Sequence, residues 1–502
     1  MVGTDQNQNM LDVAQRKLGP GGGITFREMT AAEIADRWTG GRSVLAACLA
    51  PLIAGGLAAL LLLPGLGATP LVNWDEGVYA DVARGMFRGN WYHLEWNGEA
   101  YYRKPPLLFW SMALAYGTFG VNETGVRAPS ALAGVGTAAV AGAVVAQRAG
   151  LPAALATTAC LLGSTLFIER GGRRACTDSL AIFLTMVALA RFGTEAGWHR
   201  RRLGVAIVVG LAILAKGPLG LLAPAAAFLA SIRDRARQRD TLYAAFGAIA
   251  FALPWYALQL ATEGTGFLAV HFGREIWSRA IEPIEGHAAP WWYPMWALWT
   301  GGGSWVVGAT AAVALAALTG RQRRAALAPW FLAAVLVMAA ATAVRTRLPW
   351  YCLPALPMLA VAGGMALGFL GSGLRARARL IHPAALSGLA IAALVAAPAA
   401  RRSVIETEEA FESFRVLGSV ISETLLEEPF VGATEEHPTL IFYGGRPFRF
   451  FEADELERRL LDPEAFPRAG LVPAERAAVL LEAGAVEMGR LGDLVLLRHI
   501  PL

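Results

Sequence analysis

Residues 73–110, NWDEGVYADVARGMFRGNWYHLEWNGEAYYRKPPLLFW, form the first long polar segment between apolar ones. One apolar segment precedes this stretch and many more follow it. The stretch carries the acids Asp75, Glu76 and Asp81 and the base Lys104 among several aromatic residues. Ionisable groups at membrane depth are costly and tend to be functional. The stretch therefore indicates a membrane fold and a candidate site on one of its faces.

The composition supports a polytopic membrane protein. Hydrophobic residues make up 55% of the 502 residues and charged residues only 17%, whereas soluble domains carry about a quarter charged residues. The basic residues lie in short clusters between apolar runs, a pattern that records membrane orientation rather than nucleic-acid binding. The four cysteines have no paired or metal-type spacing, so neither a disulfide framework nor a zinc cluster is expected.

A bilayer core of about 30 Å needs about twenty apolar residues per helix. The polar segment 1–43 comes before the first apolar run, which is expected to be an uncleaved anchor. The transmembrane domain is predicted over residues 44–400. Its candidate spans are residues 44–66, 126–147, 151–168, 179–193, 203–216, 217–231, 241–260, 292–318, 326–343, 349–370 and 380–399.

The apolar run 105–121 decides the orientation of all later spans. If it lies in the interface as an amphipathic helix, every strong basic cluster falls on the side of the N-terminus. We therefore predict a cytoplasmic N-terminus and a first extracytoplasmic loop over residues 67–125. The clusters are Arg148, residues 199–202, 233–239, 321–324 and 375–379.

With an odd number of spans, the tail 401–502 is extracytoplasmic as well. It reads as a small soluble α/β domain, with helical periodicity over residues 407–426 and a helix over 475–483. Residues 439–443 and 494–497 are predicted to be strands. No nucleotide-binding glycine pattern is present in it.

Asp75 and Glu76 follow the first span directly. A carboxylate that faces a cavity can act as a general base on an acceptor hydroxyl, and it can equally bind and orient an acceptor amine or phosphate relay. The alternative is that both acids only stabilise the start of a helix near residue 78, where negative charge is favoured. Asp178 is a further candidate carboxylate, with an ion pair to Arg173 or Arg174 as its alternative.

Several cations are expected on the outer face, against the orientation bias, so they favour an anionic partner such as a lipid phosphate. For Lys104, which precedes two prolines, the alternative is ordinary snorkelling towards headgroups. In the later loop, Trp and Tyr residues are more often part of an interfacial aromatic belt than sugar-stacking groups. The candidate cations are Lys104, Arg127, Lys216, Arg345 and Arg347, and the loop adds His271, Arg274, His287 and Trp291.

Taken together, these motifs resemble the integral-membrane glycosyltransferases of the GT-C class. The branch resembled is the group of aminoarabinose transferases and bacterial protein O-mannosyltransferases, families 39 and 83. The resemblance runs in order from about residue 70 to residue 370. Its motifs are Asp75-Glu76 with Tyr79, Tyr102-Arg103-Lys104-Pro105-Pro106, Val126-Arg127-Ala128-Pro129, Thr177-Asp178, Lys216-Gly217-Pro218, Gly286-His287 with Trp291, and Leu348-Pro349-Trp350-Tyr351.

The resemblance implies a mainly α-helical bundle of about 11–13 spans with interfacial helices in the first outer loop. It implies that Asp75, with Asp178 and Glu76, forms the catalytic set. The donor phosphate would be bound by Lys104, Lys216, Arg345, Arg347 and Arg127. The substrate cavity would be lined by Tyr79, Tyr102, His271, Arg274, His287, Trp291 and Tyr351.

The implied reaction transfers a sugar from polyprenyl phosphate to an acceptor. It is a single displacement, which inverts the anomeric carbon. Lipid A, a protein and an envelope glycan remain open as acceptors, at the outer face of a bacterial inner membrane. Relatives often carry an acid before Lys104, and in some it shares a metal with the residue matching His287. Here that position is Arg103, which disfavours a divalent metal and leaves His287 as the candidate ligand.

The competing class is a polytopic transporter or lipid flippase. Transporters tend to show inverted repeats with broken helices at the midplane. The sequence shows no such symmetry, and its charged residues gather at one face. The absence of a nucleotide-binding signature agrees with a lipid-linked donor.

Overall fold

The computed structural model describes residues 48–192, 198–303, 305–317, 320–372, 376–462 and 465–499. The predicted N-terminal segment 1–43 lies outside these residues. Residues Ala46–Leu502 form one compact unit, which contains both the helical bundle and the C-terminal sheet. The predicted domain boundary at residue 400 falls inside one long helix, α16.

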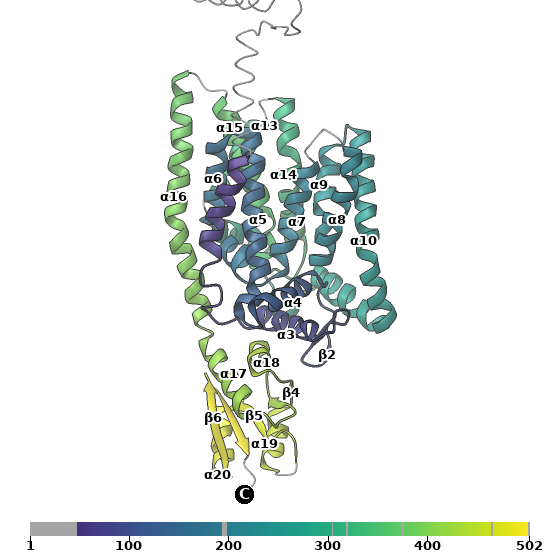
Figure 1. Ribbon diagram of the computed structural model, residues 1–502, viewed down its shortest axis with the longest axis vertical. Coiled ribbons are helices and arrows are strands. Elements are labelled where there is room, and N and C mark those ends of the chain that lie inside the picture. Colours follow the sequence, from purple (N-terminus) through teal and green to yellow (C-terminus); the bar gives the residue numbers. More distant parts are fainter. Residues whose placement is uncertain are drawn as a thin grey trace, which may run out of the picture. The chain divides into compact units, whose positions relative to one another are not determined.

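The bundle is built from helices that stand side by side (Figure 1). Among the described residues, five helices are long and apolar enough to cross a membrane, or seven if each of two bent pairs is one span. The expected spans 203–216 and 217–231 fall together in one of the five, Arg202–Ala230. The expected spans 44–66 and 179–193 are shorter helices, Cys48–Leu62 and Thr177–Phe192, whereas residues 380–399 lie in a helix of 34 residues. The helices are Cys48–Leu62, α5 (Glu123–Ala149), α6 (Leu151–Leu162), α7 (Thr177–Phe192), α8 (Trp198–Lys216), α9 (Leu222–Ala230), α10 (Arg235–Leu268), α12 (Tyr293–Gly302), α13 (Trp305–Ala317), α14 (Arg321–Ala343), α15 (Ala355–Ser372) and α16 (Ala376–Glu409).

Small residues allow these helices to approach closely, as membrane helices require. A Cβ atom at Gly364 of α15 would lie 1.9 Å from Oγ1 of Thr157 on α6, and one at Gly368 would lie 2.4 Å from Cβ of Ala149. Neither position accepts a larger side chain without a shift of the neighbouring helix. The glycines thus fix the spacing of α5, α6 and α15.

The segment predicted as the first outer loop folds into two helices at one end of the bundle, α3 (Asp75–Phe87) and α4 (Leu107–Phe119), with a two-stranded β1–β2 hairpin (Glu95–Trp96 and Glu99–Ala100) between them (Figure 1). The 13 residues of α4 rise about 20 Å, less than a bilayer core. This length agrees with the prediction that 105–121 does not span. The expectation of an amphipathic helix is wrong, because both sides of α4 are apolar. One side buries Leu108 and Met112, and Leu114 on the other side is 67% exposed.

Short irregular helices interrupt the bundle at the same end. The π-helical turn η1 follows α6 at an angle of 93°, and Gly217, with φ +56°, ends α8. At these breaks, polar segments face helix α3 and the residues just before α4. The short helices are η1 (Phe167–Arg173), η2 (Gly217–Leu221), η3 (Ala269–Ser278), α11 (Arg279–Ile281), η4 (Ile284–Gly286) and η5 (Pro349–Cys352).

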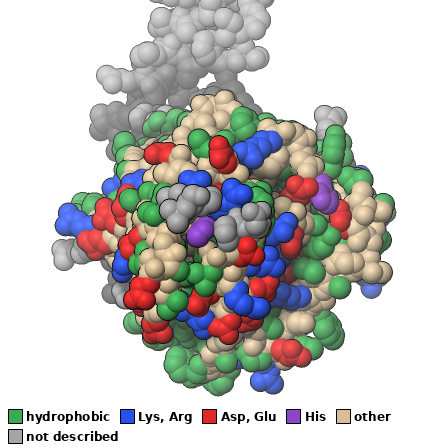
Figure 2. All heavy atoms as spheres, turned by 90° about the horizontal axis from the view of Figure 1, so that it is seen from below, with side chains coloured by type: hydrophobic (Ala, Val, Ile, Leu, Met, Phe, Trp, Pro, Cys, Tyr) green, Lys and Arg blue, Asp and Glu red, His purple; other side chains and the backbone are tan. Residues whose placement is uncertain are grey.

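The C-terminal region is a five-stranded sheet with helices, in the order β4-β3-β5-β7-β6. The pairs β3–β4 and β3–β5 are parallel, whereas β5–β7 and β6–β7 are antiparallel. Seen from this end, acidic and basic side chains are interspersed on the surface (Figure 2), as expected for a domain in water. Its elements are α17 (Glu412–Thr424), β3 (Val431–Ala433), α18 (Pro438–Gly444), β4 (Phe448–Phe450), α19 (Ala453–Leu461), β5 (Ala469–Pro473), α20 (Ala474–Glu482), β6 (Ala485–Leu491) and β7 (Leu494–His499).

The strand predicted at residues 439–443 is wrong, because these residues belong to helix α18. A short apolar run fits a strand and a helix equally well by pattern alone. Packing decides here: α18 lies against α3, where a Cβ at Gly77 would come within 2.5 Å of the backbone nitrogen of Thr439. The predicted helix at 475–483 and strand at 494–497 are confirmed as α20 and β7.

Candidate active site

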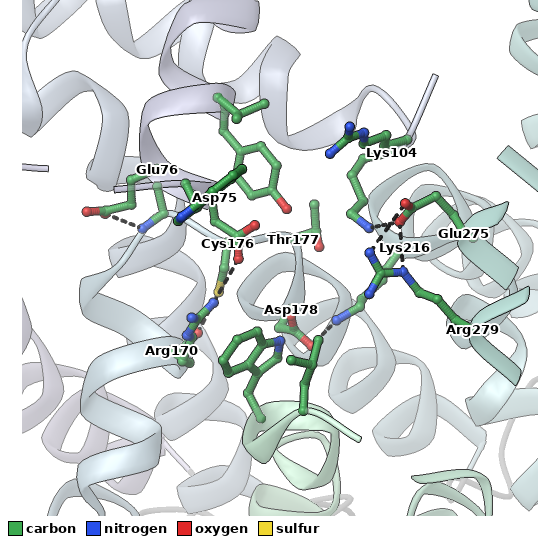
Figure 3. A pocket seen from close by; sticks show the side chains of 18 of the residues that line it. Asp75, Glu76, Lys104, Arg170, Cys176, Thr177, Asp178, Lys216, Glu275 and Arg279 are labelled. Carbon is green, nitrogen blue, oxygen red and sulfur yellow. Dashed lines mark hydrogen bonds and ion pairs between the residues drawn. The ribbon is translucent and has the colours of Figure 1, made fainter. Parts of the chain in front are cut away.

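A cavity of about 860 Å³ lies where α3, η1, the start of α7, η3 and η5 meet. Its wall brings together polar segments that are up to about three hundred and sixty residues apart in sequence, as the alternation of spans implies. Figure 3 shows Asp75 with Arg170 on one side, Lys104 with Glu275 and Arg279 on the other, and Asp178 between them. The predicted site residues that line the cavity are Asp75, Glu76, Tyr79, Lys104, Asp178, Lys216, His271, Arg274, His287 and Tyr351.

Asp75 is the first residue of α3, directly after Trp74, whose φ of 70° turns the chain into the helix. Its side chain is 44% exposed, so a substrate in the cavity can reach it. Arg170 Nη1 donates to Asp75 Oδ2 over 3.0 Å, and the guanidinium of Arg170 lies 3.7 Å from the ring centre of Trp350. The carboxylate is therefore held from one side and open on the other.

Glu76 points away from its neighbour Asp75. Arg127 donates to both Glu76 oxygens over 3.0 and 2.8 Å, and the backbone N–H groups of Val72 and Ala175 also donate to them. Burial alone would raise the pKa of Glu76, but the charge and hydrogen bonds of Arg127 and the two N–H groups hold it below its ordinary value. Glu76 is thus a buried anchor for the start of α3.

Lys104 and Arg279 share one buried carboxylate. Lys104 Nζ lies 2.7 Å from Glu275 Oε2, and Arg279 Nε lies 3.4 Å from the same oxygen. The side chain of Glu275 is only 4% exposed, whereas that of Lys104 is 27% exposed. The pairing orients two cations towards the cavity while leaving the lysine accessible.

Lys216 and Asp178 form a second ion pair, at the end of α8 and the start of α7. Lys216 leaves the helix with φ −149°, just before Gly217. The predicted alternative for Asp178, a pair with Arg173 or Arg174, is not what the structure has, because Arg173 pairs with Glu408 and Arg174 with Glu169.

Tyrosines and a histidine complete the wall. Burial, with the charge of Asp75 as the second cause, raises the pKa of Tyr79 well above its ordinary value, so its hydroxyl remains a donor. His271 Nδ1 donates to the backbone carbonyl of Tyr102 over 2.8 Å. The side chain of Tyr102 turns elsewhere, since its hydroxyl donates to Glu263 over 2.7 Å.

Five predicted site residues are absent from the described cavity wall: Arg127, Tyr102, Trp291, Arg345 and Arg347. Arg127 is fully buried on Glu76, so it cannot contact a phosphate in the cavity. Arg347 donates to the backbone carbonyls of Ala289 and Thr342. Trp291 is 64% exposed. Arg127 and Arg347 have the residue type of a phosphate site, but their side chains bind other parts of the protein.

The structure adds cavity residues to which the sequence analysis gave no role in the site, chiefly Arg170, Glu275, Arg279, Trp350 and Glu436. The spacing of Glu275, four residues after His271 and four before Arg279, was a usable signal, because residues four apart share one face of a helix. Arg170 gave no such signal. It reaches Asp75 through the π-helical turn, which no pattern of the sequence announces.

The donor set does not fit a bound metal. Among residues 48–499 as far as they are described, no group of three or more His, Cys, Asp and Glu side chains is placed to hold one. His287 lines the cavity, but so does Arg103, whose cation stands where the resemblance would need an acid. We derive no step through a metal.

The model of the dolichyl-phosphate-mannose-protein mannosyltransferase family matches residues 103–257. An undecaprenyl phosphate-alpha-4-amino-4-deoxy-L-arabinose arabinosyl transferase of Pseudomonas aeruginosa strain UCBPP-PA14 is 31% identical over 359 residues, 68% of this chain and 64% of the relative. Its counterpart in strain PAO1 is 30% identical over 388 residues, 74% of this chain and 68% of the relative. The matches thus span about two thirds of these relatives' length.

Two solved structures share the fold. The crystal structure of ArnT from Cupriavidus metallidurans bound to undecaprenyl phosphate has a TM-score of 0.76 and 20% identity, over 89% of this chain and 97% of that one. The apo state of the same protein has a TM-score of 0.71 and 19% identity, over 92% of this chain and 98% of that one. At these identities the likeness shows the fold alone.

Proposed function

Because the chain belongs to the family of undecaprenyl phosphate-aminoarabinose arabinosyl transferases, which are integral-membrane glycosyltransferases of the GT-C class, we propose that it transfers an amino sugar from undecaprenyl phosphate to lipid A. The observation that carries this proposal is that Asp75 and Lys104 line the same cavity. An acid open to an acceptor and cations open to a phosphate are the two parts that such a transfer needs.

The cations stabilise the leaving group. As the bond between the anomeric carbon and the phosphate oxygen breaks, negative charge grows on the phosphate. Preplaced cations aimed at that charge lower the barrier more than they stabilise the bound donor. We assign this role to Lys104 and Arg279, which Glu275 holds together, and to Lys216 on the neighbouring wall.

Asp75 acts on the acceptor. Its free side accepts the proton of the acceptor hydroxyl while the acceptor oxygen bonds to the anomeric carbon, on the face opposite the leaving phosphate. One displacement of this kind inverts the anomeric centre. If the acceptor is an ionised phosphate of lipid A, it brings no proton. Asp75 then orients the acceptor by contacting its sugar instead of taking a proton. Asp178 stays available as the second carboxylate, beside Lys216.

The acceptor is proposed from the charge of the cavity wall, and the sugar from the relatives. Cationic side chains such as Arg103, Arg174 and Arg274 line the cavity beside the donor set. A phosphate-bearing lipid headgroup at membrane depth suits this wall better than a neutral protein hydroxyl or glycan. The donor sugar follows the names of the relatives, which are aminoarabinose transferases.

For the location we propose the bacterial inner membrane, with the cavity and the C-terminal domain on the extracytoplasmic side. Helix connectivity supports this orientation. The cavity lies near the start of α5, whereas Arg148 lies at the far end of that helix. Likewise, α14 begins at the basic residues 321–324 and ends just before the cavity segment η5. Basic clusters mark the cytoplasmic side.

The transfer can be tested in a reconstituted assay. Purified protein in proteoliposomes is given undecaprenyl phosphate-linked aminoarabinose and lipid A, and the lipids are analysed by mass spectrometry. We expect lipid A to gain the mass of one aminoarabinose. A parallel donor with a neutral sugar and a parallel protein acceptor test the sugar and acceptor classes. Absence of transfer to all acceptors, with donor present and protein folded, contradicts the proposal and revives the transporter alternative.

A further inference from the structure

A cluster of four buried charged residues lies behind the cavity wall, next to Asp75. We call it the buried cluster, and it consists of Glu76, Arg127, Arg173 and Glu408. The side chains of Arg127, Arg173 and Glu408 are 0% exposed and that of Glu76 is 2% exposed. Two cations and two anions balance, which makes their joint burial tolerable.

Glu408 joins the two halves of the cluster. Its Oε2 accepts from Arg173 Nε over 3.2 Å and from Thr69 Oγ1 over 2.6 Å, and it lies 3.8 Å from Arg127 Nη1. Arg127 in turn donates to Thr69 Oγ1 over 2.9 Å. One carboxylate oxygen thus gathers contacts from three segments that are far apart in sequence.

Stability alone is a weak reason for such a cluster. Replacing a buried set of ion pairs by packed apolar residues is often neutral or stabilising, whereas buried ion pairs sometimes serve to specify one geometry. The other oxygen of Glu408, Oε1, is buried without a hydrogen-bond partner among the described residues. Because this burial costs free energy, stability does not explain the side chain, and the residues that it positions do.

Arg173 ends the π-helical turn η1, and Arg170 lies in the same turn. π-helical turns are frequent at functional sites. Arg173 fixes the end of the turn, because it bonds Glu408 and also donates through Nη2 to the carbonyl of Gly65 over 2.9 Å. Arg170, three residues earlier, then meets Asp75 over 3.0 Å.

The other half of the cluster holds the residue after Asp75. Arg127 binds both oxygens of Glu76, so the start of α3 cannot rotate without breaking a buried pair. Asp75 is therefore fixed twice, by its chain neighbour Glu76 and by its ion-pair partner Arg170. Both restraints lead back to Glu408.

We propose that Glu408 is a positioning residue for the acid Asp75, acting through Arg173 and the η1 turn on Arg170. The inference rests on the proposed transferase function. Glu408 lies at the end of α16, the helix that leads directly into α17 and the C-terminal sheet. Glu408 therefore links two parts of the protein: the connection to the C-terminal domain and the η1 turn, which holds Asp75 through Arg170.

The first test separates catalysis from donor binding. Glu408→Gln keeps the shape of the side chain but removes its charge, and kcat and the donor KM are measured in the transfer assay. We expect kcat to fall at least about tenfold, because small misplacements of a reacting group are costly, and the donor KM to stay within about twofold. Glu406→Gln and Glu409→Gln, exposed on the same helix turn, are matched controls with unchanged kcat.

The second test is a double-mutant cycle with Arg170→Gln. If Glu408 acts through Arg170, then Glu408→Gln costs little further kcat once Arg170 is replaced, so the two losses are not additive. A residue that only stabilises the fold would still lower kcat in that background. Should Glu408→Gln fail to fold, Arg173→Lys keeps both charges of the pair, loses the Nε donor and carries the same expectation.

Two outcomes overturn the inference: wild-type kcat in a folded Glu408→Gln or Arg173→Lys protein, or additive losses in the cycle. Both require an active wild-type protein. A wild-type protein without transfer activity contradicts the proposed function instead, so the two failures are distinguishable.

Discussion

Arg170 Nη1 lies 3.0 Å from Asp75 Oδ2, and the two residues are ninety-five positions apart. The pair joins the π-helical turn η1 to the first residue of α3. Because Arg170 also lies on the ring of Trp350, its guanidinium cannot follow a moving carboxylate. Asp75 therefore meets the cavity in one orientation, with a cation beside it.

The first prediction concerns Asp75 itself. Asp75→Asn keeps the size of the side chain but removes the charge and the proton acceptor, so we expect sugar transfer to fall by about a hundredfold or more, within the usual range for a general base. Initial rates in the reconstituted assay measure the loss. Yield and elution volume of the purified variant, compared with wild type, serve as the folding control. A variant with most of its activity would remove Asp75 from the mechanism.

The second prediction concerns the donor phosphate. Lys104→Ala removes an accessible cation and leaves Glu275 with Arg279 alone, so we expect undecaprenyl phosphate to bind at least about tenfold more weakly, as for the loss of a charge-assisted contact. Binding is measured by competition of undecaprenyl phosphate with the donor. Arg88→Ala, an exposed cation of the same loop, is the control. Equal inhibition constants for Lys104→Ala and wild type would contradict the phosphate role.

The sequence predicted which loops meet at the site better than it predicted which side chains pair there. Alternating spans place the loops of Asp75, Lys104, Asp178 and Lys216 on one face whatever their rotamers, and all four line the cavity. Which cation meets which acid depends on local turns, and the π-helical turn of Arg170 has no pattern in the sequence. Residue type alone thus identified the wall but not its ion pairs.

The misplaced predictions have a related cause. Arg127 lies at the end of its helix that is near the cavity, but its side chain points into the protein onto Glu76. A sequence does not reveal on which side of a helix a neighbouring segment packs. Residues 439–443 carry no periodicity that separates a strand from a helix, and their burial against α3 decided the outcome. Both errors come from long-range packing, which local sequence patterns do not predict.

The third prediction concerns stability and pH. Glu76→Gln removes the carboxylate that Arg127 binds and leaves the buried cluster with one anion, Glu408, for two cations. We therefore expect the free energy of unfolding to fall by about 3–5 kcal/mol, as for other broken buried pairs. The folded-state pKa of Glu76 is below its ordinary 4.5. The stability that its charge contributes is therefore present above about pH 4.5 and is lost as pH falls through the folded-state pKa.

Thermal unfolding in detergent between pH 7 and pH 3 measures this difference. The wild-type advantage over Glu76→Gln should be greatest near neutral pH and shrink below about pH 4.5. Glu99→Gln, in the exposed β1–β2 hairpin, is a control without such an effect. An advantage that grows towards low pH would mean that Glu76 is buried as the neutral acid.

The fourth prediction concerns metal dependence. Arg103 lines the cavity with His287, and a guanidinium there repels a divalent cation. We therefore expect transfer to continue at its full rate after treatment with EDTA and dialysis, with no gain on adding zinc or magnesium. Elemental analysis of the dialysed protein accompanies the assay. Loss of activity with the chelator, restored by one added metal, would show that other residues provide a metal site.

The last prediction concerns orientation in the membrane. Single cysteines are introduced as Glu285→Cys, in the η4 turn at the cavity, and Ala236→Cys, at the opposite end of α10, in a protein whose four native cysteines are replaced. Because α10 starts in a basic cluster, we expect that end to be cytoplasmic. A membrane-impermeant maleimide applied to intact spheroplasts should therefore label residue 285 and leave residue 236 unlabelled until the membrane is opened. Labelling of residue 236 alone would place the cavity in the cytoplasm, where an acceptor on the outer leaflet could not reach Asp75.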